Sequence, residues 1–567
     1  MVQALLSVPA LALLAGAQVD ATRGKLYSPR QNPTFDWDAL APSEALVWQS
    51  CYSTFFCAKL AVPLDYTSNE TSTAAIALIR YPSKFKFDDP QWRGPILYNP
   101  GGPGASGVAF IQAVGPTMSS IIGDEFDHVG LDPRGVGLST PQLKIWQAVA
   151  EQRAWVQSFP NALNGDNLGR GFVAAKTLGS LVEQRTSREA SLMSTAFVAR
   201  DMLRIVEAFG QKQLQFYGFS YGTVLGAVFA AMFPDRVGKI AIDGVVDVED
   251  YFAAQWKTTM LDTDKALNAT YDACAAAPSS CALYDPNPVV IGARVRRILN
   301  QLKREPLFVQ TSPTRYGTLD YGLAKSTLVT ALYAPYAYIS TVFAGLAAAE
   351  QGNGSVLFEA LLALNGIGAP SEWRCSTGEG GFNLETEAFA AIGCGDAVQL
   401  HDNLHDLEEY YGEISQNSTF ADVSKSRALC AGWGVQAAES YRGPFVGNTS
   451  TPLLVIGNTA DPVTPLQSAK KVAAGFKNAV VLTQNSLGHS SLAAVSTCTL
   501  AAVRDYFQAG TLPPAGTVCE TISTIFPAEA GVVTRNVADD IKLLAAANEL
   551  VRNAQLSRLG IEGILLS

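Results

Sequence analysis

A serine between two glycines is the first group in this chain that could do covalent chemistry. Ser220 lies between Gly218 and Gly222 in LQFYGFSYGTVLGAVFA, residues 214–230. Glycines suit a turn that brings two backbones close together, because they carry no Cβ. The same pattern also arises by chance in a chain with 48 glycines. Here an apolar run precedes the serine and a small-residue helical run follows it, which favours a nucleophile on a strained turn.

A serine hydroxyl becomes a useful nucleophile only when a base lies within hydrogen-bonding reach. The chain has four histidines. His489 lies in NSLGHSSL, a polar loop directly after an expected core strand, and we predict that it is the base. His128 lies at the start of a strand and is interpreted as structural.

His401 and His405 form an H-x-x-x-H pattern on an expected helix, HDNLHDLEEYY. Such spacing could place two metal ligands on one face. However, Asp402 stands where zinc peptidases have Glu, and the sequence offers no evident third ligand. No metal site and no cofactor are therefore predicted.

The third member of a proton relay is a carboxylate that orients the histidine and stabilises its charged form. Asp461, in GNTADPVTP, follows an expected strand and precedes His489 in the chain, and it is the predicted acid. Asp243, in IAIDG, also ends a strand and remains a rival. Asp132, in LDPRG, is interpreted as a structural residue that pairs with Arg134.

An oxyanion that forms during acyl transfer needs two backbone N–H groups aimed at one point. Tyr221 follows the serine and would supply one of them. The other would come from the glycine cluster after ILYN, where Pro103 has no N–H to give. Gly102 is the predicted donor and Gly101 is the second choice. The alternative interpretation is that the glycine cluster forms a plain tight turn.

These groups need a scaffold, and strands alternate with helices in two parts of the chain. This alternation predicts a mostly parallel sheet with helices on both faces. In the first part, an edge hairpin (AKLAVPLDY and TAAIALIRY) comes before the strands GPILYN, FDHVGL, LQFYGF and KIAIDG. In the second part, the order is TPLLVIG, the helix LQSAKKVAAGF and the strand AVVLTQN.

Between those parts the chain is Ala-rich and mostly helical, which predicts an α-helical insertion in the sheet domain. A variable stretch at about 140–190 has no assigned role. The expected division is a leader over 1–17, a lead-in over 18–45, the first part of the sheet domain over 46–247, a helical cap over 248–428, the second part over 429–524, and a C-terminal helix over 525–567.

Composition excludes some partners. The chain has 567 residues, is 48% hydrophobic and has a formal net charge of -10. This charge argues against nucleic acid, whose phosphates are bound by clustered Lys and Arg. No segment offers about 20 uninterrupted apolar residues, so no membrane span is predicted. The expected partner is a peptide or small ester substrate, and the oligomeric state is not predicted.

Several features favour export. An apolar N-terminal run ends in the small-x-small pattern of Ala15-Gly16-Ala17, which is typical of a signal-peptide cleavage site; a buried N-terminal helix is the alternative. Glycosylation sequons occur at Asn69, Asn268, Asn353, Asn417 and Asn448.

The nine cysteines suit disulfides better than a thiolate zinc site, because the chain contains no C-x-x-C pair. Plausible pairs are Cys51/Cys57, Cys274/Cys281, Cys394/Cys430 and Cys498/Cys519, which leave Cys375 over. We therefore expect a secreted, oxidised glycoprotein.

These motifs together resemble the proline-iminopeptidase and tripeptidyl-aminopeptidase branch of the α/β-hydrolases. NPGGPGASG resembles that branch's oxyanion loop, with Asn99-Pro100 where many iminopeptidases have a histidine. LDPRGVGLS is similar to its D-x-R-G-x-G-x-S loop, and GFSYGTVLG to its nucleophile turn. The segment from DPVTP through GHSS to Cys519 resembles the C-terminal region of tripeptidyl aminopeptidases, and the order Ser, Asp, His is that of the fold.

The resemblance implies a serine exopeptidase that releases short peptides or residues from free N-termini. It also implies acidic cap residues that hold the substrate ammonium, for which Glu385, Glu387 and Asp396 are the candidates; a solvated helix face is the other interpretation. Two alternatives stay open: an esterase, lactonase or specialised-metabolite hydrolase with the same three residues, and a binding module without catalysis.

Overall fold

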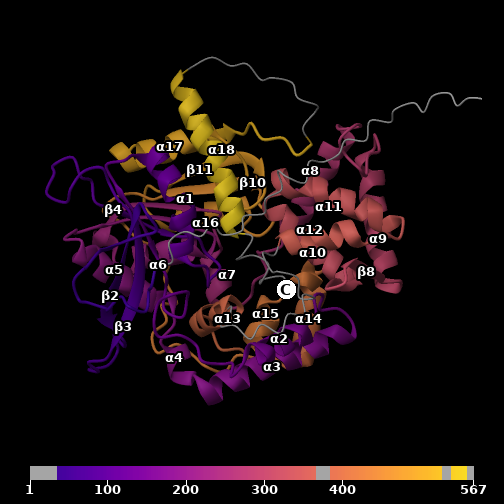
Figure 1. The fold of residues 1–567 in the computed structure, drawn as a ribbon, viewed down its shortest axis with the longest axis horizontal. Helices are drawn as coiled ribbons and strands as arrows, with labels where there is room; N and C mark the ends of the chain where they lie inside the picture. The colour runs from indigo at the N-terminus through magenta and orange to yellow at the C-terminus, as the bar shows by residue number, and fades with distance from the viewer. Residues whose placement is uncertain (1–34, 365–383, 527–537, 559–567) are drawn as a thin grey trace, which may run out of the picture.

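A ten-stranded, mostly parallel sheet organises the protein (Figure 1). The computed structural model describes residues 35–364, 384–526 and 538–558. In spatial order the strands are β1 (Gln49–Cys51), β2 (Phe55–Pro63), β3 (Thr73–Tyr81), β5 (Asp127–Leu131), β4 (Pro95–Asn99), β6 (Leu214–Phe219), β7 (Val237–Asp243), β10 (Leu454–Ala460), β11 (Val480–Leu487) and β12 (Val518–Glu520).

The predicted hairpin is present, since β2 and β3 pair antiparallel from Phe56–Arg80 to Pro63–Thr73. From β5 to β12 neighbouring strands pair in parallel. The central strands β4, β5 and β6 are buried almost throughout, which is typical of parallel strands in a sheet covered on both faces. The carboxyl ends of these strands therefore meet along one edge of the sheet.

Helices cover both faces of the sheet. On one face α1 (Gly107–Ile122) packs with α17 (Thr497–Ala509) and α18 (Ala538–Arg558), within one hydrophobic core. Buried residues of α5, α6 and α16 belong to the core on the other face. Their bounds are Thr195–Ala208, Tyr221–Met232 and Leu466–Gly475. Helix α18 lies in the segment for which the sequence predicts a C-terminal helix.

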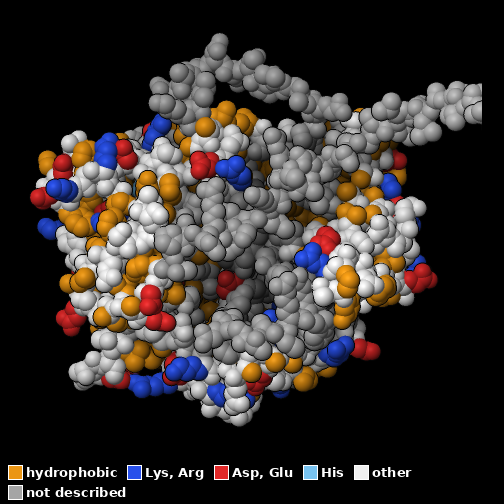
Figure 2. All heavy atoms as spheres, in the orientation of Figure 1, with side chains coloured by type: hydrophobic (Ala, Val, Ile, Leu, Met, Phe, Trp, Pro, Cys, Tyr) orange, Lys and Arg blue, Asp and Glu red, His pale blue; other side chains and the backbone are white. Residues whose placement is uncertain are grey.

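A second lobe, with a hydrophobic core of its own, lies beside the sheet (Figure 1). Its helices are α8 (Thr263–Ala275), α9 (Pro288–Arg304), α10 (Tyr321–Tyr333), α11 (Pro335–Glu350) and α12 (Ser355–Leu364). It also contains an antiparallel hairpin of β8 (Leu307–Ser312) and β9 (Arg315–Leu319), which the mostly helical prediction for this segment missed. The face seen in Figure 2 is hollowed between the sheet and this lobe.

The stretch at 140–190 folds into helices that pack on the later part of the expected cap. It contains α2 (Val149–Ser158), α3 (Asp166–Arg185) and α4 (Ser187–Ser191), and α3 contacts α14 (Leu404–Ile414) and α15 (Ser426–Ala431). A Cβ built on Gly179 would lie 1.9 Å from the carbonyl oxygen of Gly432, so the two backbones can approach only because this residue is glycine.

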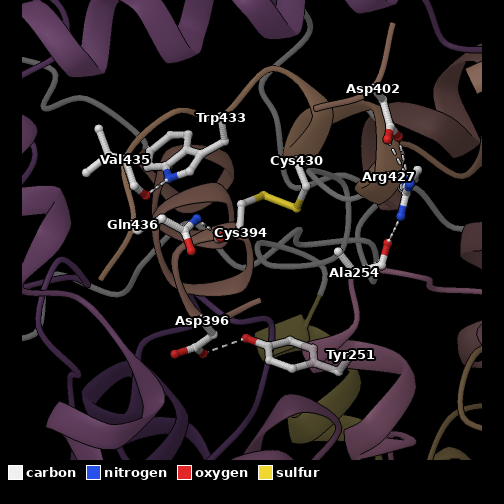
Figure 3. The surroundings of a disulfide bond; sticks show 10 residues. All are labelled: Tyr251, Ala254, Cys394, Asp396, Asp402, Arg427, Cys430, Trp433, Val435 and Gln436. Carbon is white, nitrogen blue, oxygen red and sulfur yellow. Dashed lines mark hydrogen bonds and ion pairs between the residues drawn. A yellow bond between two sulfur atoms is a disulfide. The ribbon is translucent and has the colours of Figure 1, made fainter. Parts of the chain in front are cut away.

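All four expected disulfides are present: Cys51–Cys57, Cys274–Cys281, Cys394–Cys430 and Cys498–Cys519. The third joins α13 (Glu385–Asp396) to α15, as Figure 3 shows. Cys375 and the expected leader over 1–17 lie outside the described residues.

Two local predictions were wrong. Arg134 does not pair with Asp132; its guanidinium binds Asp201 at 2.7 Å, while Asp132 accepts hydrogen bonds from the Ser106 hydroxyl and the Val108 amide. A buried arginine satisfies its donors where carboxylate and carbonyl oxygens converge, which neighbouring positions in a turn could not offer. His401 is not helical either, because α14 begins only at Leu404.

Candidate active site

Ser220 occupies a sharp turn between β6 and α6. Its φ of 55° lies in the left-handed region, which is rare for a residue with a side chain and is typical of functional sites. Cβ atoms built on Gly218 and Gly222 would lie 2.3 Å from the Gly222 carbonyl oxygen and 2.6 Å from the Asn99 carbonyl oxygen. Both glycines are thus required by the close approach of backbones, as the sequence pattern predicts.

The structure brings His489 and Asp461 together across two loops at the strand ends. His489 Nδ1 lies 3.0 Å from each carboxylate oxygen of Asp461. With Nδ1 turned toward the carboxylate, Nε2 is the ring nitrogen that can act as a base. The hydroxyl of Thr464 donates to Asp461 Oδ2 at 2.7 Å and also lies 3.0 Å from Nδ1.

Asp461 is fully buried but remains suited to carry a negative charge. Burial tends to raise the pKa of its carboxyl, but His489 and the hydrogen bonds to the carboxylate outweigh burial and hold the pKa below its usual value. The backbone amides of Val463, Thr464 and Ser490 all donate to it, at 2.8 to 3.0 Å. A charged acceptor with fixed donors can orient the imidazole.

His489 lies against the end of β7, next to the serine turn. The backbone N–H of Ser220 donates to the carbonyl of Asp243 at 3.0 Å. A Cβ built on the following residue, Gly244, would lie 3.2 Å from His489 Cε1. The imidazole therefore packs beside the residues that hold the Ser220 backbone. Tyr333 of α10 packs edge-on to the imidazole from the second lobe, with ring centroids 5.2 Å apart.

Asp243, the rival acid, has other hydrogen-bond partners. Its carboxylate accepts from the backbone N–H of Ser491 at 2.9 Å and from the hydroxyl of Tyr217 at 3.2 Å. These bonds fasten the loop just after His489 to the sheet, which favours Asp461 over Asp243 as the partner of the imidazole.

The glycine-rich loop after β4 abuts the serine turn. A Cβ built on Gly101 would lie 2.7 Å from Ser220 Cβ and 3.1 Å from Tyr221 N. The N–H of Gly101 donates to the side chain of Asn99 at 3.0 Å, whereas Gly102 lines the same pocket as Ser220. Because the N–H of Gly101 is already bound to Asn99, Gly102 is favoured over Gly101 as the second oxyanion donor.

A buried hydrogen-bond chain, which sequence reasoning missed, fixes the side chain of Tyr221. The Thr195 hydroxyl donates to Asp396 Oδ2 at 2.5 Å and lies 2.6 Å from the Tyr221 hydroxyl, which must then be the donor in that contact. Tyr251 also donates to Asp396, at 2.9 Å (Figure 3). Burial raises the pKa of Asp396 to about 7. A threonine at a helix start gives no sequence signal for this role.

The other two predicted cap acids lie at the start of α13. Glu387 is only 1% exposed and accepts hydrogen bonds from the indole of Trp146 and the amide of Gln152. Asp396 is fully buried too, so the solvated-face interpretation is wrong for both residues. The carbonyl oxygen of Glu385 would lie 2.8 Å from a Cβ built on Gly104, which brings α13 against the glycine-rich loop.

Glu385 has a strongly shifted acidity. Burial, with a smaller contribution from Glu387, raises the pKa of its carboxyl to about 8. A cation near this carboxyl would favour its ionised form.

A pocket opens beside Ser220, between the sheet edge and the cap. It is lined by Gly102, Ser220, Val246, Asp247, Trp256, Thr258, Thr259, Met260, Tyr333, Phe389, Ser424, Lys425, Ser426, Val463, Thr464, Pro465 and Ser468. Residues from the strand ends, the second lobe and the segment around α15 all contribute. The pocket is therefore formed only when these parts of the chain come together.

The remaining predicted features lie elsewhere. His128 is buried, and its contacts are those of a structural residue. Its Nδ1 lies 2.8 Å from the Tyr98 hydroxyl, and burial lowers its pKa to about 4.

Within the described ranges, no three His, Cys, Asp or Glu residues are grouped so as to hold a metal ion. No helix among the residues described is long and apolar enough to cross a membrane. The asparagines of all five sequons are exposed.

Two family models match parts of this chain. The family model described as alpha/beta hydrolase fold matches residues 94–302, and the model described as TAP-like protein matches residues 417–519. The first match contains Ser220 and the second contains Asp461 and His489.

Several curated proteins are similar over most of their length. Serine protease Hip1 of Mycobacterium tuberculosis is 27% identical over 92% of this chain and 97% of that protein. Carboxylesterase B of the same species is 28% identical, over 88% and 94%. Tripeptidyl aminopeptidase of Streptomyces lividans is 24% identical, over 86% and 89%.

Among solved structures, 2-hydroxy-6-oxo-6-phenylhexa-2,4-dienoate hydrolase from Rhodococcus is 12% identical, with 77% of this chain and 93% of that chain covered. The TM-score is 0.31.

Proposed function

We propose that this serine hydrolase with the α/β-hydrolase fold is an exopeptidase. It would release short peptides or residues from free N-termini through an acyl-enzyme intermediate. In this proposal Ser220 is the nucleophile, His489 the base and Asp461 the acid that orients it. The observation that carries it is the pairing of His489 Nδ1 with both oxygens of Asp461, beside a strained serine turn.

Each residue has a defined step in this chemistry. Neutral His489 takes the proton of the Ser220 hydroxyl as the oxygen attacks the scissile carbonyl. The N–H groups of Gly102 and Tyr221 stabilise the oxyanion of the tetrahedral intermediate. His489 then gives its proton to the leaving amine, and water, activated by the same imidazole, hydrolyses the ester to Ser220.

The preference for a free N-terminus rests on the carboxylates of α13. Glu385 and Glu387 lie at the helix end that packs on the glycine-rich loop. A substrate ammonium near these acids would favour the charged form of both partners, and an acylated N-terminus would lose that attraction. The likeness to tripeptidyl aminopeptidase supports the same assignment. Asp396, the third proposed acid, is buried in the hydrogen-bond chain that runs through Thr195 to Tyr221.

Export belongs to the proposal as well. Four disulfides among the described residues and five exposed sequon asparagines suit a secreted glycoprotein. The segment over 1–17 would act as the signal peptide. Disulfide-bonded domains persist in oxidising compartments, which is the physical basis of this assignment.

A second candidate function, hydrolysis of carboxylic esters or lactones, is favoured by the likeness to carboxylesterase B. The same three residues could serve both reactions, because an ester differs from an amide mainly in its leaving group. Substrate choice therefore separates the two candidates.

The test uses tripeptidyl anilides with free and acetylated N-termini, beside short acyl esters. We expect the free peptide to be cleaved and its acetylated form to be cleaved at least about 100-fold more slowly in kcat/KM, the factor that a lost charged contact of roughly 3 kcal/mol gives. Equal rates on both peptides, or activity on esters alone, would overturn the exopeptidase assignment. Labelling of Ser220 by a fluorophosphonate, and its absence in Ser220→Ala, reports whether the serine is the nucleophile.

A further inference from the structure

The first turn of α16 faces the pocket beside Ser220. This helix begins directly after the loop of Asp461, and Thr464, Pro465 and Ser468 all line the pocket. The amides of a first helical turn have no partner within the helix, and the helix dipole makes this end positive. In a ten-residue helix such an end attracts an anion.

Two buried donors in the same pocket have no hydrogen-bond partner among the described residues. Ser468, in the first turn of α16, is 1% exposed, and its hydroxyl is one of them. The indole N–H of Trp256 is the other, in a residue 8% exposed. A buried donor without a partner raises the free energy of the folded protein, because it has lost its hydrogen bonds to water. A ligand that accepts these hydrogen bonds would be stabilised in the pocket.

The backbone of Trp256 is also strained. Its φ is 52°, in the left-handed region, and Ala254 shares that conformation. Such strain persists only where surrounding structure enforces it, and it is concentrated at functional sites.

A lysine completes the donor set. Lys425 is 4% exposed, lines the pocket between Ser424 and Ser426, and has its ammonium 5.4 Å from the centre of the Phe159 ring. Burial lowers the pKa of its amino group to about 7. A carboxylate bound beside the amine would raise that pKa again and hold the charge on it.

Among the described residues that line this pocket, Asp247 is the only carboxylate, and cationic and amide donors already bind it. Both oxygens of Asp247 lie 2.9 Å from the ammonium of Lys471, and one also accepts the backbone N–H groups of Glu249 and Asp250. Asp247 therefore does not oppose an anion in this pocket, whereas Lys425 and the α16 terminus line it with cationic and dipolar donors.

We propose that this pocket binds a carboxylate of the substrate, held by Lys425, Ser468, Trp256 and the first turn of α16. The enzyme then prefers peptides or esters that carry an acidic group near the bond that is cleaved. This inference rests on the proposed function, because it assigns specificity to the pocket of Ser220. It concerns a different charge from the ammonium proposed to lie near α13.

The test compares tripeptidyl anilides in which one residue is Glu or the isosteric Gln, placed at each of the three positions in turn. We expect at least about a tenfold higher kcat/KM for Glu at one position, the ratio that corresponds to 1.4 kcal/mol. Matched half-esters and amides of a dicarboxylic acid test whether a non-peptide carboxylate is preferred in the same way. Ratios near one throughout, or a preference for Gln, would overturn the proposal.

Variants then assign the preference to the pocket. In Lys425→Met the Glu-to-Gln ratio should fall to about one, and in Ser468→Ala and Trp256→Phe it should fall several-fold. Lys470→Met removes the same charge from the exposed side of α16 and should keep the wild-type ratio. An unchanged ratio in Lys425→Met would also contradict the inference.

Should a variant fail to fold, the wild-type enzyme still decides. Glutarate should inhibit competitively, and glutaramide at the same concentration and ionic strength should not. If fluorophosphonate labels Ser220 while glutarate and glutaramide act alike, the carboxylate pocket is rejected and the serine mechanism stands. If Ser220 is not labelled, the proposed function itself has failed.

Discussion

At the scale of single residues, the surroundings of the proposed catalytic side chains fix the conformation of Ser220 and the orientation of the Asp461 carboxylate. Ser220 is held in a left-handed conformation that exposes its side chain at the end of a strand. Asp461 accepts three backbone N–H groups and the Thr464 hydroxyl, so its carboxylate orientation is fixed before any substrate arrives. Such preorganised dipoles need little rearrangement as charge develops.

Substitution of the two rival acids tests the residue assignment. We expect Asp461→Asn to lower kcat by roughly 10³-fold or more, because an amide would present N–H groups to donors and favour the wrong imidazole tautomer. Asp243→Asn is the matched control at the neighbouring strand end. It should lower kcat far less, because the Asp243 carboxylate accepts hydrogen bonds from Ser491 and Tyr217. Steady-state kinetics on the same anilide would reject the assignment if the order were reversed.

At the scale of elements, α13 connects parts of the site that lie far apart in the chain. Its first residues pack on the glycine-rich loop at Gly104, and its last residue, Asp396, ends the chain through Thr195 to Tyr221. Phe389, between them, lines the pocket. The helix therefore packs directly on the loop that contains Gly102 and is linked to the Tyr221 side chain through Thr195. The Cys394–Cys430 disulfide holds the helix to α15 (Figure 3).

Removing that disulfide should affect catalysis as well as stability. In Cys394→Ser/Cys430→Ser we expect KM to rise and kcat to fall several-fold, because α13 and the residues around Lys425 both contribute to the pocket wall. The closed loop spans 36 residues, and its loss should cost about 4 kcal/mol of unfolding free energy.

The control removes a disulfide remote from the pocket. Cys51→Ser/Cys57→Ser opens a loop of six residues between β1 and β2, which should cost about 2 kcal/mol and leave kcat and KM as they are at temperatures where both variants are folded. Equal kinetic effects of the two double variants would contradict a positioning role for α13.

At the scale of the whole molecule, two hydrophobic cores meet at the candidate site. The core of the second lobe includes Ala460 and Val463, which flank Asp461. The Thr263 hydroxyl at the start of α8 donates to the carbonyl of Pro462 at 2.6 Å. The loop of the proposed acid is thus part of the interface between lobes, and stability of the lobe and geometry of the site are coupled.

Buried acids should make that stability depend on pH, and Asp396 gives the clearest case. The folded protein keeps a proton on it up to about pH 7, whereas the unfolded chain releases it near 3.8. The bound proton on Asp396 therefore adds at most about 4 kcal/mol to the free energy of unfolding. This contribution is complete below pH 3.8 and is lost as the pH rises from 3.8 through 7. Asp396→Asn cannot titrate, so the fall in Tm that it causes should be largest near pH 4 and smaller at pH 8. Thermal unfolding of both proteins measures this, and a constant difference would contradict the expectation.

Much of the site was readable from the sequence because its signals are local. A nucleophile turn needs glycines at fixed spacing, and Gly218 and Gly222 supply them whatever surrounds them. The strands were recognised because short, mostly apolar runs such as PILY and LVIG, each followed by a turn, are typical of strands inside a covered sheet. Cysteine spacing likewise indicated all four pairs, although spacing alone leaves connectivity open.

The sequence by itself determined which side chains could do chemistry, and in which order the chain presents them. Only the tertiary structure decided between Asp461 and Asp243 as partner of His489, replaced Asp132 by Asp201 as the partner of Arg134, and brought Thr195, Trp146 and Lys425 to the site. These contacts join residues many positions apart, and a buried polar group takes whichever partner the packing of the two lobes brings within reach. No local pattern can encode that choice.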